Sequence, residues 1–332
     1  MTVLGIETSC DETAAAVSRG GDILASIVSS QTIHSRYGGV VPEVASREHE
    51  KLLAPVVEAA LSDADIALTD LDGVAVTRGP GLMGPLLTGV SFAQGLAKGM
   101  DIPCLGINHI EAHIFANFIA WPRLGYPFLC LLVSGGHTQI WKVDGLGRYQ
   151  LLGETRDDAA GEAFDKGARI LGLGFPGGPA IEKAARGGNE DAVVFPQAFL
   201  KSPAIEFSFS GLKTALLDHV RRLGAPPLGQ RLSDVAASYQ KAIVSVLLSK
   251  LKQAVDRTGI GTAVIAGGVA ANGRLRFLAR ELLPDSTVLY PEQSLCTDNG
   301  AMVAFLGEKY LEKSPGKRPV DLTVVPNLRL PG

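Results

Sequence analysis

The sequence predicts an α/β fold in which one pattern of strand, turn and strand occurs twice. A six-residue apolar run at Phe128–Val133 meets the turn Ser134-Gly135-Gly136 and then continues as an extended segment. Near the N-terminus, the apolar run Val3–Ile6 leads into a polar turn and then an alanine-rich strand. Placing Ser9 over Ser134 superposes the two patterns, which lie about 125 residues apart. We therefore expect a duplicated domain with a phosphate-binding turn in each half.

The chemistry of the two turns supports this expectation. The adjacent glycines Gly135 and Gly136 let backbone N–H groups face a ligand without a Cβ atom, an arrangement that suits phosphate oxygens. The alternative interpretation is that Ser134-Gly135-Gly136 is the turn of an ordinary β-hairpin and binds no ligand. The first turn carries Asp11 and Glu12, and a carboxylate beside phosphates normally acts through a metal ion or a water, since direct contact would be repulsive.

The first half of the chain alternates strands with helices. Apolar residues at 52, 53, 56, 57 and 60 share one face of a helix. The expected elements are a three-strand meander within 3–30, a helix at 43–61, a strand at 73–77, a helix at 83–99 and a strand at 102–107. This β-α-β-α-β order implies a mixed, largely parallel sheet covered by helices.

The second half repeats that theme. After the hairpin at Phe128 we expect a loop and a helix at 159–171, a turn at 172–179 and a short helix that carries Glu182. The remaining expected elements are a helix that opens at 207–211, a long helix at 232–258, a strand at 262–266, a helix at 274–283, a strand at 288–290 and a last helix from 300 to about 311.

The composition is that of a soluble globular chain. Hydrophobic residues make up 46% and charged residues 20% of the 332 residues, and no apolar run approaches the roughly 20 residues that cross a bilayer. The sequence begins with a strand pattern rather than a leader peptide, so we expect a cytoplasmic protein. The four cysteines include no C-x-x-C pair, which favours reduced thiols. The net charge of −3 provides no global basic field, so a nucleic-acid partner would need a local patch.

The segment Asn108-His-Ile-Glu-Ala-His113 is a candidate metal site. Its two histidines, His109 and His113, are four residues apart and lie on one face of a helix, where both imidazoles can bind one metal ion. The same spacing also occurs on helices that bind no metal. A metal needs a further ligand, and Asp298 is the best candidate, although its position before a helix also suits an N-cap.

The same segment raises the alternative of a metalloprotease. In the H-E-x-x-H arrangement, the glutamate beside the first histidine acts as a base on metal-bound water. Here Glu111 lies two residues after His109, about 200° around the helix, so it points away from the metal. The protease interpretation therefore lacks its base.

The segment Gly267–Asn272 follows an apolar strand and precedes a helix. Its glycines allow a flat ligand to approach the backbone, and the helix N-terminus favours negative charge. Such turns are frequent in α/β folds, so this signal is weak alone. Asp165, Gly178 and Glu182 are candidates to contact a ribose, although each also suits a surface acid or a turn.

Taken together, the motifs resemble one family over nearly the whole chain. They are, in order, GIETSCDET, YGGVVPEVASREH, GPGLMGPLLTG, NHIEAH, LLVSGGHT, DDAAGEAFDKGARILGLGFPGGP, FSFSGLKT, AGGVAANGRLR and CTDNGAM. On these residues the chain is identified as a member of the TsaD family. The resemblance implies a duplicated actin/Hsp70/sugar-kinase-like fold with two lobes flanking a nucleotide cleft. We expect residues 1–125 and 300–332 to form the first lobe and residues 126–299 the second.

The resemblance also implies an enzyme of tRNA modification. Family members are acyltransferases that transfer threonylcarbamoyl from threonylcarbamoyl-AMP to N6 of adenosine 37 in tRNAs reading A-starting codons, which forms t6A and releases AMP. The implied metal ligands are His109, His113 and Asp298, with Fe²⁺ favoured and Zn²⁺ possible. The implied adenylate contacts are Leu132, Val133, Ser134, Gly135, Gly136, Asp165, Gly178, Glu182 and Asn272. We expect Asp11 or Glu12 to handle the amine proton.

The implied partners are tRNA, a paralogous TsaB-like subunit and a small TsaE-like ATPase, with no membrane. An ATPase or chaperone-like protein of the same superfamily remains the alternative, since it would share both phosphate turns and bind ATP or AMP. Such a protein would have no need of the paired histidines. A metalloprotease is a more distant third interpretation.

Overall fold

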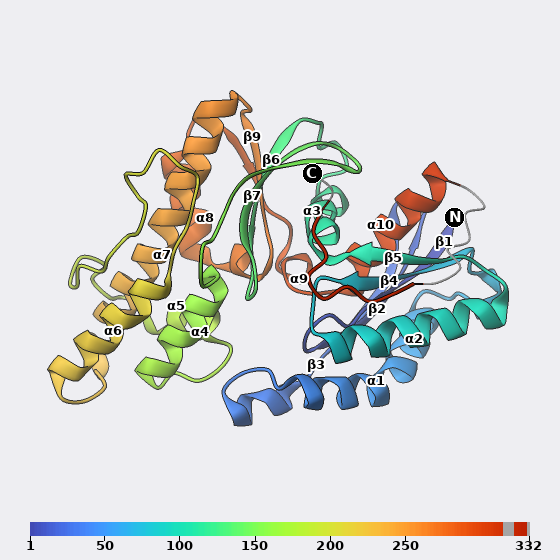
Figure 1. The fold of residues 1–332 in the computed structure, drawn as a ribbon, viewed down its shortest axis with the longest axis horizontal. Helices are drawn as coiled ribbons and strands as arrows, with labels where there is room; N and C mark the ends of the chain where they lie inside the picture. The colour runs from blue at the N-terminus through green and yellow to red at the C-terminus, as the bar shows by residue number, and fades with distance from the viewer. Residues whose placement is uncertain (315–321, 331–332) are drawn as a thin grey trace. The chain divides into compact units, whose positions relative to one another are not determined.

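The computed structural model of the chain describes residues 1–314 and 322–330 (Figure 1). These residues form two compact units, one from Met1–Leu124 with Pro291–Leu330 and the other from Gly125–Tyr290. Each unit contains one five-stranded sheet.

The unit boundary differs from expectation at the C-terminal end. Residues 291–299 were expected in the second lobe but group with the first unit. The reason is packing, because Leu295 contacts a buried cluster formed by Ala16, Ala301 and Ala304. Residues 315–321 and 331–332 of the expected first-lobe segment lie outside the described residues.

The sheet of the first unit has the strand order β3-β2-β1-β4-β5. Its strands are β1 (Thr2–Glu7), β2 (Glu12–Arg19), β3 (Asp22–Ser30), β4 (Gly73–Gly79) and β5 (Cys104–Asn108). The meander β1-β2-β3 is antiparallel, whereas β1, β4 and β5 run parallel to one another. The helices of this unit are η1 (Thr32–Tyr37), α1 (Pro42–Asp63), η2 (Leu68–Asp70), α2 (Met83–Met100), α3 (His109–Ala120), α9 (Gln293–Cys296) and α10 (Gly300–Lys313).

The core of the first unit lies between its sheet and its helices. The predicted apolar face of α1 is buried, with Leu53, Val56 and Val57 packed in the same cluster as the β1 side chains. The C-terminal helix α10 packs closely on β1, so that a Cβ atom at Gly5 would lie 2.2 Å from the backbone nitrogen of Ala304. A larger residue at position 5 would therefore separate α10 from the sheet.

The sheet of the second unit has the strand order β10-β9-β6-β7-β8. Its strands are β6 (Phe128–Val133), β7 (Thr138–Gly145), β8 (Arg148–Glu154), β9 (Thr262–Ala266) and β10 (Thr287–Leu289). Its helices are α4 (Ala160–Leu171), α5 (Gly177–Ala184), α6 (Ser210–Leu223), α7 (Gly229–Thr258), η3 (Gly268–Ala271) and α8 (Gly273–Leu282). None of the described helices is long and apolar enough to cross a membrane.

The predicted duplication is confirmed by the register of the strands. Read from the meander edge, β3-β2-β1-β4-β5 and β8-β7-β6-β9-β10 have the same arrangement. Glu7 pairs with Ala14 in the first hairpin, and Leu132 pairs with Gln139 in the second, an offset of 125 residues on both strands. The two hairpins are therefore equivalent residue by residue.

The strand β8 was not predicted, because the sequence places a loop directly after the second hairpin. Its residues RYQLLGE mix polar and apolar side chains without a regular alternation. Pairing with β7 on one side, and the bridge between Thr155 and Phe207 just beyond its end, hold this segment extended. Tertiary pairing thus overrides a weak local signal.

Candidate active site

Three predicted metal ligands come together in the first unit. His113 Nε2 lies 3.0 Å and His109 Nε2 3.5 Å from the same oxygen, Oδ1 of Asp298. One ligand atom from each residue falls within 4.8 Å of the other two. The Asp298 side chain is 21% exposed, whereas that of His113 is 1% exposed, so the cluster is open to solvent on the Asp298 side.

The positions of the histidines follow from how α3 begins. Strand β5 ends at Asn108, whose side-chain oxygen caps the helix by accepting hydrogen bonds from the amides of Ile110 and Glu111. His109 is therefore the first residue of α3, and His113 follows one turn later on the same face. Asp298 precedes α10 but does not cap it, because Asn299 accepts from the Met302 amide instead. The carboxylate of Asp298 is thus available to the histidines.

Glu7, at the end of β1, fixes the orientation of His109. Its Oε2 lies 3.1 Å from His109 Nδ1 and accepts a hydrogen bond from the hydroxyl of Thr77 on the neighbouring strand β4. The hydroxyl of Ser9 lies 3.2 Å from the same ring nitrogen. Sequence reasoning did not single out Glu7, although a carboxylate ending a buried strand beside a polar turn is a signal that would have found it.

The charges of this cluster are interdependent. Burial lowers the pKa of His109, but the carboxylates of Asp298 and Glu7 outweigh burial and raise it to about 9. Burial raises the pKa of Glu7, yet the nearby His109 holds it below its ordinary value. The cluster therefore carries opposite charges that stabilise one another.

The residues of the cluster fit a divalent metal ion. Both Nε2 atoms point at the carboxylate, and Glu7 occupies the other nitrogen of His109, as the outer partner of a metal-bound histidine normally does. The second ring nitrogen of His113 is buried without a hydrogen-bond partner among the described residues, so that no hydrogen bond there fixes its tautomer. Two imidazoles and a carboxylate form a donor set that suits zinc, iron and related metals.

The environment of Glu111 excludes the metalloprotease alternative. Glu111 is buried and accepts a hydrogen bond of 2.5 Å from the hydroxyl of Tyr310 on α10. As the helical spacing predicted, Glu111 is directed at another helix rather than at the ligand cluster. The hydrolytic base of such enzymes is thus missing from the position where the motif would place it.

The turn between β1 and β2 carries the two predicted acidic residues, Asp11 and Glu12, which are hydrogen-bonded to each other. Burial raises the pKa of Glu12 to about 10, and the negative charges of Asp298 and Asp11 contribute to this rise. Glu12 is therefore protonated at neutral pH. A protonated carboxyl donates a hydrogen bond, so Asp11 accepts from Glu12.

A buried histidine on α1 holds this turn in place. His49 Nε2 donates to the carbonyl of Cys10 at 3.0 Å, and its Nδ1 accepts from the hydroxyl of Thr13 at 2.8 Å. Burial lowers the pKa of His49, which favours the neutral ring that this pattern requires. The turn is thereby fixed at both ends.

The second unit places its glycine turn where β6 ends. The Ser134 amide donates to the carbonyl of His137, and the His137 amide donates to the Ser134 hydroxyl oxygen. Gly135 and Gly136 are exposed, and neither donates its amide to another described residue. The turn therefore presents two amides to solvent, as the sequence suggested for phosphate oxygens.

Two other glycines allow close packing around this turn. A Cβ atom at Gly161, near the start of α4, would lie 2.5 Å from the carbonyl oxygen of Ser134. Gly267, just after β9, has a φ of +86°, and a Cβ atom there would lie 2.5 Å from the carbonyl oxygen of Val133. The start of α4 and the loop after β9 thus both border the end of β6.

Other predicted adenylate contacts lie on the helices α4 and α5 of the same unit. Asp165 Oδ1 accepts from the Gly177 amide at 2.7 Å, and Gly178, which follows, has open space where a Cβ atom would lie. Glu182 Oε1 accepts from the Gly273 amide at 2.9 Å.

Asn272 is the most constrained of these residues. Its side-chain oxygen caps α8 by accepting from Leu275, and its side-chain nitrogen donates to Gln240 at 2.9 Å. Gln240 was not predicted and reaches Asn272 from α7. The side-chain amide of Asn272 has two N–H donors, and the bond to Gln240 uses one of them.

Solved structures identify the class of fold. The chain is similar to the activator of the 2-hydroxyisocaproyl-CoA dehydratase from Clostridium difficile, with a TM-score of 0.56 and 15% identity over 97% of this chain and 100% of that one. It is also similar to HypF from T. kodakarensis, with a TM-score of 0.62 and 15% identity over 94% of this chain and 48% of that one. Fold and cluster define a protein of the actin, Hsp70 and sugar-kinase fold that carries a His-His-Asp cluster in its first unit.

The chain belongs to the TsaD family. The model of that family, described as tRNA N6-adenosine threonylcarbamoyltransferase, matches residues 22–305. A relative from Symbiobacterium thermophilum with the same description is 51% identical over 99% of this chain and 96% of its own length. Another from Desulfitobacterium hafniense is 52% identical over 99% of this chain and 98% of its own length.

Proposed function

We propose that this chain transfers the threonylcarbamoyl group from threonylcarbamoyl-AMP to N6 of adenosine 37 in tRNAs that read A-starting codons. The products are t6A and AMP. The observation that carries the proposal is the convergence of His109, His113 and Asp298 in a chain that belongs to this family over nearly its full length. An ATPase of the same fold would have no use for that cluster.

The first unit supplies the metal ligands in this proposal. His109, His113 and Asp298 would hold one divalent cation, for which Fe²⁺ is the first candidate and Zn²⁺ the second. When bound, such a cation supplies Lewis-acid polarisation of carbonyl or phosphate oxygens. Glu7 keeps the ring of His109 oriented for that purpose.

The second unit supplies the adenylate contacts. The amides of Gly135 and Gly136 are free to bind phosphate oxygens, and carboxylate oxygens that already accept an amide can accept a ribose hydroxyl as well. The remaining amide proton of Asn272 would bind the nucleoside. The proposed contacts are Leu132, Val133, Ser134, Gly135, Gly136, Asp165, Gly178, Glu182 and Asn272.

The reaction requires one proton to leave the attacking amine. The N6 lone pair forms a bond to the carbamoyl carbon, the bond from that carbon to the phosphate oxygen breaks, and AMP leaves with the electron pair. The aromatic amine N6 is a poor nucleophile, so most of the rate enhancement comes from holding it in the correct orientation against the carbamoyl carbon. We assign the acceptance of the N6 proton to Asp11, because burial favours the protonated form of Glu12.

We further propose that the chain acts in the cytoplasm with a paralogous TsaB-like subunit and a small TsaE-like ATPase. Support comes from α2, where Met83 is 55% and Leu87 53% exposed one turn apart. Uncovered apolar side chains of this kind favour association. Leu87→Glu should abolish a complex seen by size-exclusion chromatography of the mixed proteins, whereas the exposed control Lys98→Glu should retain it. A complex that survives Leu87→Glu would remove α2 from the interface.

The transfer itself is tested by mass spectrometry of nucleosides from an unmodified tRNA. The tRNA is incubated with this protein, its proposed partners and threonylcarbamoyl-AMP. Wild-type protein should form t6A, Asp298→Ala should not, and the surface control Asp256→Ala should match wild type. Absence of t6A with wild type, in a system whose other components work with a related TsaD, would overturn the proposal.

A further inference from the structure

We propose that the exposed basic face of α6, extended by Arg231 at the start of α7, binds the phosphate backbone of tRNA. This basic face consists of Lys213, Arg221, Arg222 and Arg231. The inference rests on the proposed function, which makes tRNA the substrate, and it names the surface that would receive it.

The first argument is the local excess of positive charge. Between Ser210 and Arg231 there are four basic side chains and a single carboxylate, Asp218, in a chain whose net charge is −3. Asp218 lies 3.9 Å from Arg221, and both side chains are more than half exposed. An exposed pair at this distance neutralises little of the arginine's field. The basic face is therefore a positive region on a chain that is negative overall.

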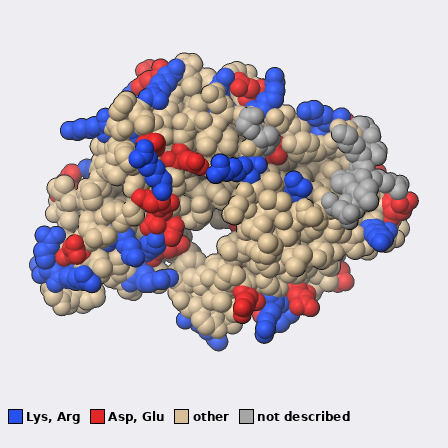
Figure 2. Space-filling view, in the orientation of Figure 1, with Lys and Arg blue, Asp and Glu red and all other residues tan. Residues whose placement is uncertain are grey.

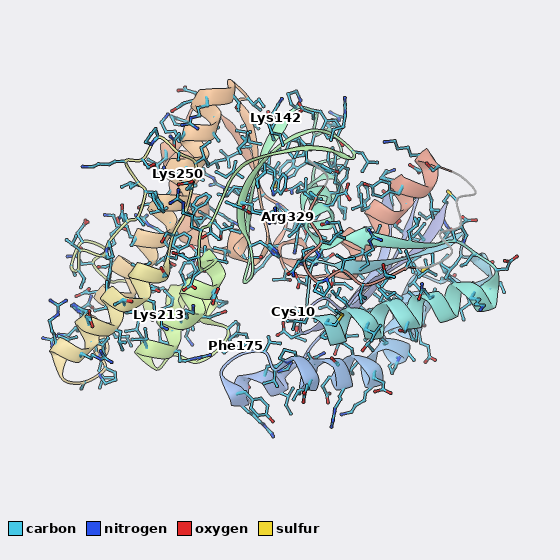
Figure 3. The ribbon with its side chains drawn as sticks, in the orientation of Figure 1. Cys10, Lys142, Phe175, Lys213, Lys250 and Arg329 are labelled. Atoms are coloured by element: carbon cyan, nitrogen blue, oxygen red, sulfur yellow. The ribbon has the colours of Figure 1, made fainter. Side chains whose placement is uncertain are left out.

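The second argument is the arrangement of these side chains. All four are exposed. Lys213 and Arg221 are eight residues apart, which places them a little over two turns from each other along α6 and about 80° apart around its axis. Figure 2 shows lysine and arginine side chains gathered over the end of α6, and Figure 3 shows Lys213 nearer its start. From Lys213 to Arg222 the face extends over about 14 Å along α6, which is long enough to contact more than one phosphate.

The environment of His219 gives independent evidence that the arginines converge. Burial lowers the pKa of this histidine, and the positive charges of Arg222 and Arg231 lower it further. The two arginines come from different helices and act on the same ring. A positive potential that disfavours a protonated histidine favours an anion at the same place.

The other arginine group of this unit is already engaged. On α8, Arg274 forms a 2.6 Å ion pair with Glu190, and Arg276 donates to the carbonyl of Ala270. Arg280 donates to the hydroxyl of Tyr290 at 2.9 Å. On α6 the partners are weaker, since Arg221 has an exposed pair with Asp218 at 3.9 Å and Arg222 donates one hydrogen bond, from Nε to the Asp218 carbonyl at 3.2 Å. A phosphate could bind the other guanidinium N–H groups there without breaking an ion pair as short as that of Arg274. The observations therefore favour α6 over α8.

The start of α6 is tied to the loop that precedes α4. Asp157, in that loop, accepts hydrogen bonds from the amides of Phe209 and Ser210 and from the hydroxyls of Ser208 and Ser210. Helix α4 carries Gly161 and Asp165, so the basic face begins close to the proposed adenylate contacts and extends away from them. An RNA stem lying along α6 would keep its adjoining loop near those contacts.

Salt-dependent binding provides the test. Each phosphate that is neutralised releases counterions, so a lost contact reduces the dependence of log K on log salt by about one unit. The test variant is Arg221→Gln/Arg222→Gln/Arg231→Gln. The control is Lys51→Gln/Lys252→Gln/Lys309→Gln, which removes the same charge from lysines in exposed or partly exposed ion pairs elsewhere. Circular dichroism and thermal unfolding check that both variants are folded.

Binding of an unmodified tRNA transcript is measured by fluorescence anisotropy across a salt series, with and without the partner proteins. The test variant should bind at least tenfold more weakly at 0.15 M salt, with a slope reduced by two to three units, and should retain its affinity for AMP. The control should bind as wild type does. Unchanged slope and affinity in the test variant would overturn this inference and leave the proposed function intact.

Two other outcomes are distinguishable. If wild-type protein binds no tRNA under any of these conditions, the proposed function fails, and the inference fails with it. If the test variant binds tRNA normally but no longer forms a complex with a partner protein, the basic face is a protein-binding surface, and the inference is wrong. In turnover assays the test variant should show a raised KM for tRNA and an unchanged kcat.

Discussion

Glu7 Oε2 lies 3.1 Å from His109 Nδ1, although the two residues are 102 positions apart in the sequence. The contact joins the ends of β1 and β5, two strands separated by β4, and Thr77 of β4 donates to the same oxygen. Parallel strands that end at one edge of a sheet bring such residues together. The geometry assigns Glu7 the positioning of His109 rather than a place among the ligands.

Glu7→Gln should therefore weaken metal binding without unfolding the protein. Loss of a carboxylate that holds a ligand histidine typically costs 10- to 100-fold in metal affinity. Competition with a chromogenic chelator measures this affinity for Zn²⁺ or Co²⁺, and Glu58→Gln, an exposed change on α1, serves as control. Equal affinities for Glu7→Gln and wild type would show that Glu7 has no part in the site.

Asp11 and Glu12 should respond differently to neutralisation. Glu12 is protonated at neutral pH, and glutamine can still donate a hydrogen bond to Asp11, so Glu12→Gln should change the rate only a few-fold. Asp11→Asn should lower the single-turnover rate by 10²- to 10⁴-fold, as for loss of a general base. The rate is measured with threonylcarbamoyl-AMP bound. A larger loss for Glu12→Gln than for Asp11→Asn would reverse the assignment.

Gly161→Ala should weaken nucleotide binding by moving the glycine turn. Its new Cβ atom would lie 2.5 Å from the Ser134 carbonyl oxygen, so the turn must shift. Gly178→Ala meets no described atom within 4 Å, and a loss of AMP affinity there would report contact with the ligand itself. Gly211→Ala, also in open space, is the neutral control. Isothermal titration calorimetry with AMP compares the affinities of the three variants. Full affinity in Gly161→Ala would contradict the expected shift of the glycine turn.

Lys250 should make the free energy of unfolding depend on pH in the alkaline range. Its buried ammonium group donates to the carbonyls of Ser202 and Ala204 and to Gln253, and it lies on α7 (Figure 3). Burial and the charge of Arg257 lower the pKa of Lys250 below 10.5. At a pH between the lowered pKa and 10.5, Lys250 is more often protonated in the unfolded chain than in the folded one. The contribution of Lys250 to the free energy of unfolding therefore rises with pH in this range.

Lys250→Met tests both parts of that argument. Two buried carbonyls would lose a donor, which costs about 1–3 kcal/mol for each group left unpaired. Urea unfolding at pH 8 and pH 10 should show a less stable variant whose free energy of unfolding rises less, or falls more, over that interval than that of wild type. The exposed Lys252→Met should follow wild type, and identical pH dependence in Lys250→Met would contradict the pKa argument.

Most of the fold could be predicted from local sequence patterns, namely apolar periodicity and helix-breaking residues. The helices at 42–63, 83–100 and 160–171 have strong apolar periodicity or clear breakers, and each was predicted to within two residues. The strand β8 was missed because its stability comes from pairing with β7 rather than from its own residues. Residues 291–299 group with the first unit rather than the second, and Leu295 packs there against Ala16, Ala301 and Ala304.

The residues of the candidate site also fall into two groups, those whose role follows from local spacing and those whose role depends on distant partners. His109 and His113 were predictable, since four-residue spacing on a helix fixes their relation. Gln240 was not, because its role depends on a partner 32 residues away. Glu7 was not singled out either, although its place at the end of a buried strand was a usable signal, because its partner His109 is 102 residues away. Asp298 was predicted as a ligand, but only the structure shows that the neighbouring Asn299 takes the capping role.

The packing of α10 against β1 has a consequence for how the protein is made. The ribosome synthesises Glu7 and both histidines early, but Asp298 emerges only after nearly the whole second unit has left the exit tunnel. At 5–20 residues per second, the two imidazoles wait about 10–40 seconds for their carboxylate. A chain that terminates before Asp298 therefore has neither the third proposed ligand nor the helix that covers its first strand. Metal loading should thus mark chains whose translation has been completed.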